Sequence, residues 1–301
     1  MLRPFDYHRP RALDEACALG ATLEGAAYLA GGTDLLVQIR EGKQRCRHVI
    51  DLKHVAGLER LRRDGDCLVI GALATVTDLL ETEAVHAEPG LALLRDAGAV
   101  FGCEEIRHRA TVCGNVAHAS PGAEYGSPMF VLEATCVIHG PTGERILPVA
   151  DFYRRPGQSA LGPGEILKAL RVPIAPRTAR SAYLRRSRVR GMDLAALNLA
   201  LLVLDADDPH RRRVRVAMGA VAGTPIRAPE VEALLSGGPI TTDRLERARA
   251  LVSSGISPRP TSLRASPEYK KAMVAHLLEA GLARLLSPFP EADGAAAEAA
   301  P

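Results

Sequence analysis

The sequence pattern changes from that of a strand to that of a helix at the stretch Ala30-Gly31-Gly32-Thr33-Asp34-Leu35-Leu36. The residues before it, 26–29, are apolar and suit a short buried strand, and the residues after it mix apolar and polar positions like an amphipathic helix that ends at Gly42. Glycine lets the backbone approach a ligand closely, and a helix begins with unpaired N–H groups. Thr33 is expected to cap the helix through its hydroxyl. The stretch therefore suits an anion-binding turn, although a glycine pair at such a place is more often only a tight turn.

A second glycine-containing stretch combines small residues with hydroxyl and amide side chains. It runs Arg109-Ala110-Thr111-Val112-Cys113-Gly114-Asn115-Val116-Ala117-His118-Ala119-Ser120-Pro121-Gly122. Small residues let the backbone approach a ligand, and threonine and asparagine can hydrogen-bond to it. The spacing of the two stretches suits two loops that converge on one ligand.

Together these stretches resemble the two flavin-diphosphate loops in the FAD-binding subunits of the molybdenum hydroxylases, the xanthine dehydrogenase and carbon monoxide dehydrogenase family. The resemblance continues through Phe5–Pro10, Glu105–Arg107, Pro163–Leu167 and Pro260–Tyr269, so it covers roughly residues 4–285. It implies that the chain binds FAD and belongs to a redox complex.

The resemblance also implies which residues hold the diphosphate. The first loop would contribute Ala30, Gly31, Gly32, Thr33, Asp34 and Leu35. The second would contribute Thr111, Gly114, Asn115, Ala117 and His118. Because a carboxylate beside a phosphate is repulsive, Asp34 is expected to favour the helix N-terminus while its side chain points away from the ligand.

Four further residues match positions that the family places around the rest of the cofactor. Glu124 falls where the family commonly has an aspartate that binds the adenosine side, and Phe101 matches an aromatic residue near the flavin. Leu161 matches an apolar residue on the ring, and Arg185 falls near a lysine at the polar end of the flavin. Cys113 departs from the family pattern, which usually has glycine there, so the loop must accommodate a side chain.

Composition excludes several other classes of function. The 301 residues are 47% hydrophobic and 24% charged with a net charge of +3, which suits a globular protein and gives no support for a nucleic-acid partner. No apolar run reaches the ~18 residues that a membrane span needs, and no secretory signal is present, so a cytoplasmic location is expected. The six cysteines form no C-x-x-C pair and the nine histidines show no ligand spacing, so no metal site is expected.

The order of patterns along the chain predicts an α+β fold. A small N-terminal β-α-β unit (1–55) and a larger mixed α+β unit (56–174) form a two-part FAD-binding domain. A C-terminal domain of antiparallel strands and helices (175–286) follows, and a tail (287–301) shows no apolar periodicity. No G-x-G-x-x-G follows a strand, which argues against a Rossmann domain.

The leading hypothesis is an electron-transfer subunit of a heterotrimer. It would take electrons from a two-iron two-sulfur small subunit, next to a molybdenum-cofactor large subunit that carries the substrate chemistry, and pass them to NAD+ or another acceptor. One alternative is a self-contained flavin oxidase or dehydrogenase of the same fold. The other is an assembly subunit without redox function. The substrate of the complex stays open.

Overall fold

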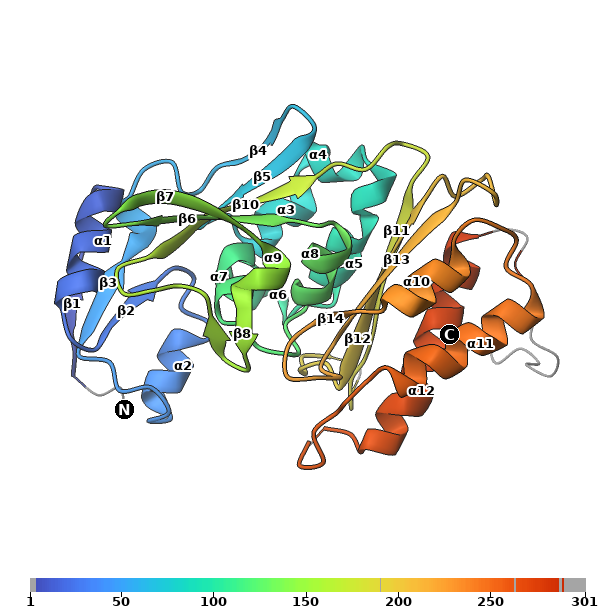
Figure 1. Cartoon of the computed structure of the whole chain (residues 1–301). Coiled ribbons are helices and arrows are strands. Elements are labelled where there is room, and N and C mark those ends of the chain that lie inside the picture. The colour runs from blue at the N-terminus through green and yellow to red at the C-terminus, as the bar shows by residue number, and fades with distance from the viewer. Residues whose placement is uncertain (1–3, 190, 263, 287–288, 290–301) are drawn as a thin grey trace.

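Three larger sheets follow one another along the chain, and helices pack between and beside them (Figure 1). The computed structural model describes residues 4–189, 191–262, 264–286 and 289. The expected tail therefore lies outside the described residues, apart from residue 289. The mixture of helices with largely antiparallel sheets confirms the α+β class. None of the helices in the described part is long and apolar enough to cross a membrane.

The first unit is a small parallel sheet with the strand order β1–β3–β2. Its elements are β1 (Asp6–His8), α1 (Leu13–Thr22), β2 (Ala26–Leu29), α2 (Leu35–Arg40), β3 (His48–Asp51) and the 3-10 turn η1 (Leu52–His54). Strands β2 and β3 pair in parallel around α2, which confirms the predicted β-α-β unit. The sequence pattern did not predict β1, which pairs with the other edge of β3.

The second unit is built on a five-stranded antiparallel sheet in the order β4–β5–β10–β6–β7. Its strands are β4 (Leu61–Asp64), β5 (Cys67–Gly71), β6 (Thr135–Gly140), β7 (Gly143–Pro148) and β10 (Ile166–Pro173). Two hairpins, β4–β5 and β6–β7, belong to this sheet. Strand β10 lies between them and joins them into one sheet, because it pairs with β5 on one side and β6 on the other.

Short helices connect the strands of this unit. They are α3 (Val76–Glu81), α4 (Glu83–His86), η2 (Pro89–Leu91), α5 (Ala92–Ala99), α6 (Glu104–Arg107), α7 (Val112–Ala117), α8 (Gly126–Val131) and α9 (Val149–Phe152), followed by the ribbon β8 (Tyr153–Arg155) and β9 (Gln158–Ser159). A capping box starts α3: the Thr75 hydroxyl accepts from Asp78 N, and the Asp78 carboxylate accepts from Thr75 N.

The third unit is a four-stranded antiparallel sheet with three helices on one face. Its elements are β11 (Arg180–Arg186), β12 (Leu197–Leu204), β13 (Arg213–Gly219), β14 (Ile226–Arg227), α10 (Pro229–Leu235), α11 (Thr242–Ser254) and α12 (Pro267–Leu285). The antiparallel strands and the helices expected of the C-terminal domain are confirmed.

Every residue of β12 is buried, because its sheet lies between two layers of helices (Figure 1). Ala200, Leu202 and Leu204 belong to the core of the second unit, where α5 and α8 cover the sheet. Leu199 and Val203 belong to the other core, which α10 and α12 complete. Side chains alternate between the two faces of a strand, so one strand supplies both cores. The third unit is thereby fixed against the second.

Candidate functional site

The first glycine loop connects β2 to α2. Gly32 has a φ of +78°, in the left-handed region that favours glycine. Helix α2 begins at Leu35 with Asp34 at the N-cap, so the expectation that Thr33 caps the helix is wrong. The Asp34 side chain does not cap the helix either. Instead it is turned toward the second loop.

The second loop begins with α7, whose N-cap is Thr111. The Thr111 hydroxyl accepts a hydrogen bond from Gly114 N at 3.0 Å. The side-chain oxygen of Asn115 accepts from the backbone N–H of Tyr125 at 3.1 Å, which ties α7 to the segment leading into α8. Two of the predicted cofactor-binding side chains thus shape the loop itself.

Cys113 is accommodated by the core rather than by the loop surface. Its side chain is buried, and its Sγ donates to the carbonyl oxygen of Ile70. Burial raises the pKa of this thiol well above its ordinary value, so it stays protonated. The departure from glycine at this position therefore places no side chain among the proposed phosphate contacts.

The two loops lie against each other, as the sequence predicted. A Cβ atom on Gly31 would lie 2.0 Å from the carbonyl oxygen of Arg109, at the start of the second loop. Further along, an Asp34 carboxylate oxygen lies 2.8 Å from His118 Nδ1 and 3.0 Å from Gln38 Nε2. The hydrogen bond with His118 lowers the pKa of Asp34 below its ordinary value near 3.8, against the opposing effect of burial.

A buried ion pair joins the second unit to the C-terminal sheet. Arg185 Nη1, from β11, lies 3.0 Å from a carboxylate oxygen of Glu124, and the side chains are only 9% and 6% exposed. Arg185 also donates to the carbonyl oxygen of Asp193 at 3.0 Å. Burial raises the pKa of Glu124 although Arg185 opposes the shift. The resemblance placed these residues at opposite ends of FAD, whereas the structure places them in direct contact.

Phe101 and Leu161 lie on the core of the second unit, where both are partly buried. The Phe101 ring centroid is 6.0 Å from that of Tyr125, the residue after Glu124. An aromatic pair and the buried ion pair therefore occupy neighbouring positions. Such an arrangement suits a planar ring system with a polar edge.

A cationic hollow lies beside the end of the second loop, and the sequence did not predict it. Its lining includes Ser120 and Gly122 together with Arg259, Arg264 and Lys270 from the C-terminal unit, and none of its described lining residues is acidic. Lys270 is 5% exposed and donates to the carbonyl oxygen of a neighbouring loop at 2.8 Å. Burial, followed by the two arginines, lowers the pKa of this lysine.

One sequence signal could have identified Lys270. It lies four, seven and eight residues before Val274, Leu277 and Leu278, which places a lysine on the apolar face of α12. No comparable sequence pattern identifies Tyr125. The residues that it contacts are distant in the sequence or are not arranged in a periodic pattern.

The arrangement fits a bound dinucleotide diphosphate. The loops approach at Gly31, where a side chain would collide with the backbone of the second loop, and together they offer backbone N–H groups and polar side chains on one site. The aromatic and buried ionic groups next to α8 can accommodate the ring system.

Comparisons with known proteins agree with this geometry. Residues 3–175 match the model of the FAD binding domain in molybdopterin dehydrogenase, and residues 182–285 match that of the CO dehydrogenase flavoprotein C-terminal domain. The chain is 32% identical to the putative xanthine dehydrogenase FAD-binding subunit of Escherichia coli, over 93% of this chain and 94% of that protein. It is 31% identical to the carbon monoxide dehydrogenase medium chain of Afipia carboxidovorans, over 93% and 96%.

A solved structure gives the same result. The reconstituted CO dehydrogenase from Oligotropha carboxidovorans contains a chain that superposes with a TM-score of 0.89 at 30% identity, covering 95% of this chain and 98% of that one. The chain therefore belongs to the FAD-binding subunits of the xanthine dehydrogenase and carbon monoxide dehydrogenase family of molybdenum hydroxylases, and it is an FAD-dependent oxidoreductase subunit.

Proposed function

We propose that this chain is the electron-transfer subunit of a cytoplasmic heterotrimer, with a molybdenum-cofactor large subunit and a two-iron two-sulfur small subunit as its partners. Bound FAD accepts electrons singly and gives them up in pairs, which lets one subunit join iron–sulfur centres to a two-electron acceptor. The observation that carries the proposal is the contact between the two glycine loops at Gly31 and Arg109.

The chain's own residues would hold and orient the cofactor. The backbones of Ala30–Leu35 and of Thr111–His118 would bind the diphosphate. Phe101 and Leu161 would pack on the flavin ring, and Arg185 would lie at its polar edge, where a fixed cation stabilises negative charge on the reduced ring. Glu124, paired with Arg185, would then act at the flavin end rather than on the adenosine side.

A titration of the purified full chain with FAD tests the cofactor. We expect one FAD per chain with a dissociation constant on the order of micromolar or lower, together with a visible flavin spectrum that bleaches with dithionite. A folded chain that stays colourless would end the proposal. A chain that binds FAD and oxidises a substrate by itself would favour the self-contained oxidase, and flavin that resists reduction would favour the assembly role.

The acceptor is proposed to be NAD+ or another anionic acceptor, and the cationic hollow supports this choice. Arg259, Arg264 and Lys270 line it, and no acidic side chain is found among the described residues of the lining, which suits phosphate groups. Stopped-flow reduction of the FAD-loaded chain by NADH tests the idea. Lys270→Met should slow the reduction, whereas Lys271→Met, a matched change at the exposed neighbouring position, should not.

A further inference from the structure

Helix α8 ends with a glutamate at a position where glycine is most common. Glu133 N–H donates to the carbonyl oxygen of Phe130, and Ala134 N–H donates to that of Met129. These two bonds form a Schellman motif with Glu133 at its left-handed residue, and the φ of Glu133 is +52°. A residue with a side chain is strained in this conformation. The presence of glutamate instead of glycine at this position therefore requires another explanation.

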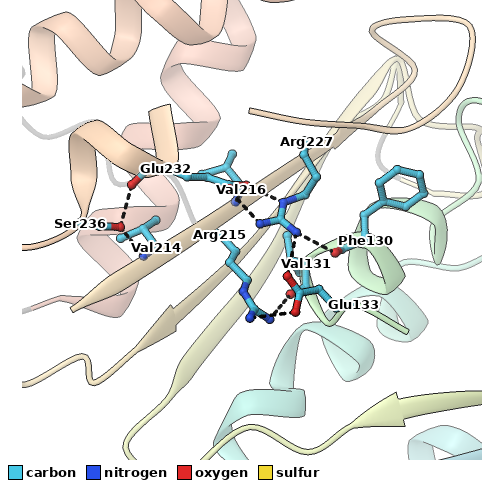
Figure 2. Close-up of polar contacts among 9 residues, drawn as sticks. All are labelled: Phe130, Val131, Glu133, Val214, Arg215, Val216, Arg227, Glu232 and Ser236. Atoms are coloured by element: carbon cyan, nitrogen blue, oxygen red, sulfur yellow. Dashed lines mark hydrogen bonds and ion pairs between the residues drawn. The ribbon is translucent and has the colours of Figure 1, made fainter. Parts of the chain in front are cut away.

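Two arginines of the C-terminal unit bind that carboxylate, as Figure 2 shows. Arg215 Nη2 lies 2.9 Å from Glu133 Oε2, and Arg227 Nη1 lies 3.5 Å from Oε1. The same arginines donate to carbonyl oxygens at the end of α8: Arg215 to Val131 at 3.2 Å, and Arg227 to Phe130 at 3.2 Å. Cations at a helix C-terminus also interact favourably with its dipole. We call Glu133, Arg215 and Arg227 the interdomain clamp.

The clamp is anchored firmly on the C-terminal side. Arg227 makes two bonds to Glu232 of α10, at 2.5 and 2.7 Å, and the same carboxylate accepts from Val216 N of β13 at 2.9 Å (Figure 2). One turn further, the Ser236 hydroxyl accepts from Val214 N of the same strand. Helix α10 thus binds the part of β13 that β14 leaves unpaired, and the arginines extend from there to α8.

The other end of α8 begins at the proposed cofactor site. Glu124 lies two residues before the helix and pairs with Arg185, and Ser127 in its first turn donates to the Asn198 side chain at 2.6 Å. Arg185 and Asn198 are directly opposite in the β11–β12 pairing, so they lie on the same face of the sheet. One six-residue helix therefore connects the clamp to the Glu124–Arg185 pair.

We propose that the interdomain clamp positions α8 on the C-terminal sheet and thereby sets the relative position of Glu124 and Arg185 in the cofactor site. This inference rests on the proposed function for its effect on FAD. It assigns a reason to the strained Glu133: the carboxylate is needed for the two arginines, although glycine would suit the backbone better. Glu133, Arg215 and Arg227 are positioning residues, because they act on the cofactor through α8.

Two substitutions at Glu133 separate positioning from simple helix termination. Glu133→Gly relieves the strained backbone and removes both ion pairs, while Glu133→Gln keeps the shape and removes the charge. If the residue only ends the helix, Glu133→Gly leaves FAD binding unchanged and raises thermal stability. If the clamp positions the site, both variants weaken FAD binding by roughly tenfold and shift the flavin midpoint potential in the direction produced by Arg185→Met.

A double-mutant cycle shows whether the effect passes through Arg185. In an Arg185→Met background, Glu133→Gln should change the FAD dissociation constant by less than about twofold, because the group that it positions is absent. Arg215→Met removes one of the two arginines that pair with Glu133 and should weaken FAD binding as the Glu133 variants do. Its control is Arg213→Met, which removes an exposed arginine from the same strand and should leave FAD affinity unchanged. Full tenfold effects in the Arg185→Met background, or wild-type affinity and potential in both Glu133 variants, would overturn the proposal.

Amide hydrogen exchange of the full chain without FAD keeps this test separate from the proposed function. Glu133→Gln should speed exchange at Glu124, Tyr125 and Gly126, at the far end of α8 from the substitution. Unchanged exchange there would overturn the clamp even if FAD binds. Failure of the wild-type chain to bind FAD would overturn the proposed function, and the exchange result alone would then decide the clamp.

Discussion

Gly31 and Arg109 are in backbone contact although 78 positions separate them in the chain. A Cβ atom on Gly31 would lie 2.0 Å from the Arg109 carbonyl oxygen and 2.8 Å from the carbonyl carbon. A carbonyl cannot rotate away as a side chain can, so the loops must separate if Gly31 gains a side chain. The two proposed phosphate-binding loops can therefore keep this mutual position only while residue 31 is glycine, whose side chain is a single hydrogen atom.

Gly31→Ala should weaken FAD binding by more than tenfold and lower the free energy of unfolding by ~1–3 kcal/mol, because the added methyl group overpacks the contact. Isothermal titration with FAD and urea unfolding measure the two effects. Gly223→Ala is the matched control, since its Cβ would lie 3.6 Å from Pro156, an ordinary van der Waals distance. Unchanged affinity in Gly31→Ala would show that the contact does not form the site.

Arg185→Met should make stability depend strongly on pH. Burial holds the folded-state pKa of Glu124 above its ordinary value near 4.5, so the folded chain retains that proton more tightly than the unfolded chain. The corresponding stability is present below about pH 4.5 and is lost as the pH rises through the folded-state pKa. Without Arg185 the carboxylate is buried and unpaired, and the loss near neutral pH should reach about 3 kcal/mol.

Denaturant unfolding of Arg185→Met between pH 4 and 8 measures this loss. Adding Glu124→Gln should remove most of the extra pH dependence, because a neutral amide has no proton to lose. An identical pH profile in wild type and Arg185→Met would show that the two side chains do not interact in solution.

Asp34→Asn should weaken the connection between the loops at neutral pH but not in acid. The folded-state pKa of Asp34 lies below its ordinary value, so its stabilisation is present above about pH 3.8 and disappears as the pH falls through the folded-state pKa. The pair is half exposed, so the expected effect is only about 0.5 kcal/mol. Unfolding curves at pH 3 and pH 7 provide the comparison, with Asp66→Asn, an exposed aspartate in the β4–β5 turn, as the charge control. A difference that does not shrink as the pH falls would contradict this explanation.

Thr111→Ala should lower the free energy of unfolding by about 1 kcal/mol, because the Gly114 N–H loses its N-cap acceptor. Thr111→Ser retains the hydroxyl and should behave nearly like the wild type. Thermal unfolding distinguishes the two variants, and FAD titration shows whether the start of α7 must be ordered for binding. Equal losses in both variants would assign the effect to the methyl group instead of the cap.

Local patterns predicted the elements well, but they predicted contacts between elements poorly. The apolar periodicities of β12 and α12 determine those elements nearly alone, because their packing follows from the sequence pattern. Caps were less certain: the sequence favoured Thr33 as the N-cap of α2, whereas Asp34 occupies that position. Several capping residues in a row leave the choice to tertiary packing.

The candidate site shows the same difference between local patterns, which could be predicted, and contacts between elements, which could not. The glycine loops were recognisable by their residue types, and their contact could be anticipated from the family resemblance. The Glu124–Arg185 pair and the contacts of Glu133 with Arg215 and Arg227 could not be anticipated. They join residues that are distant in the sequence, on elements whose relative position depends on the whole sheet.

The double burial of β12 restricts how this protein can change by recombination. Because alternate side chains of one strand complete two different cores, removing the C-terminal unit would expose an apolar surface on α5 and α8, and the excised unit would carry the complementary surface. Exchange of that unit with a relative's would succeed only if the faces of α5 and α8 were exchanged with it. The two parts therefore depend on each other for complete cores, although each carries its own sheet.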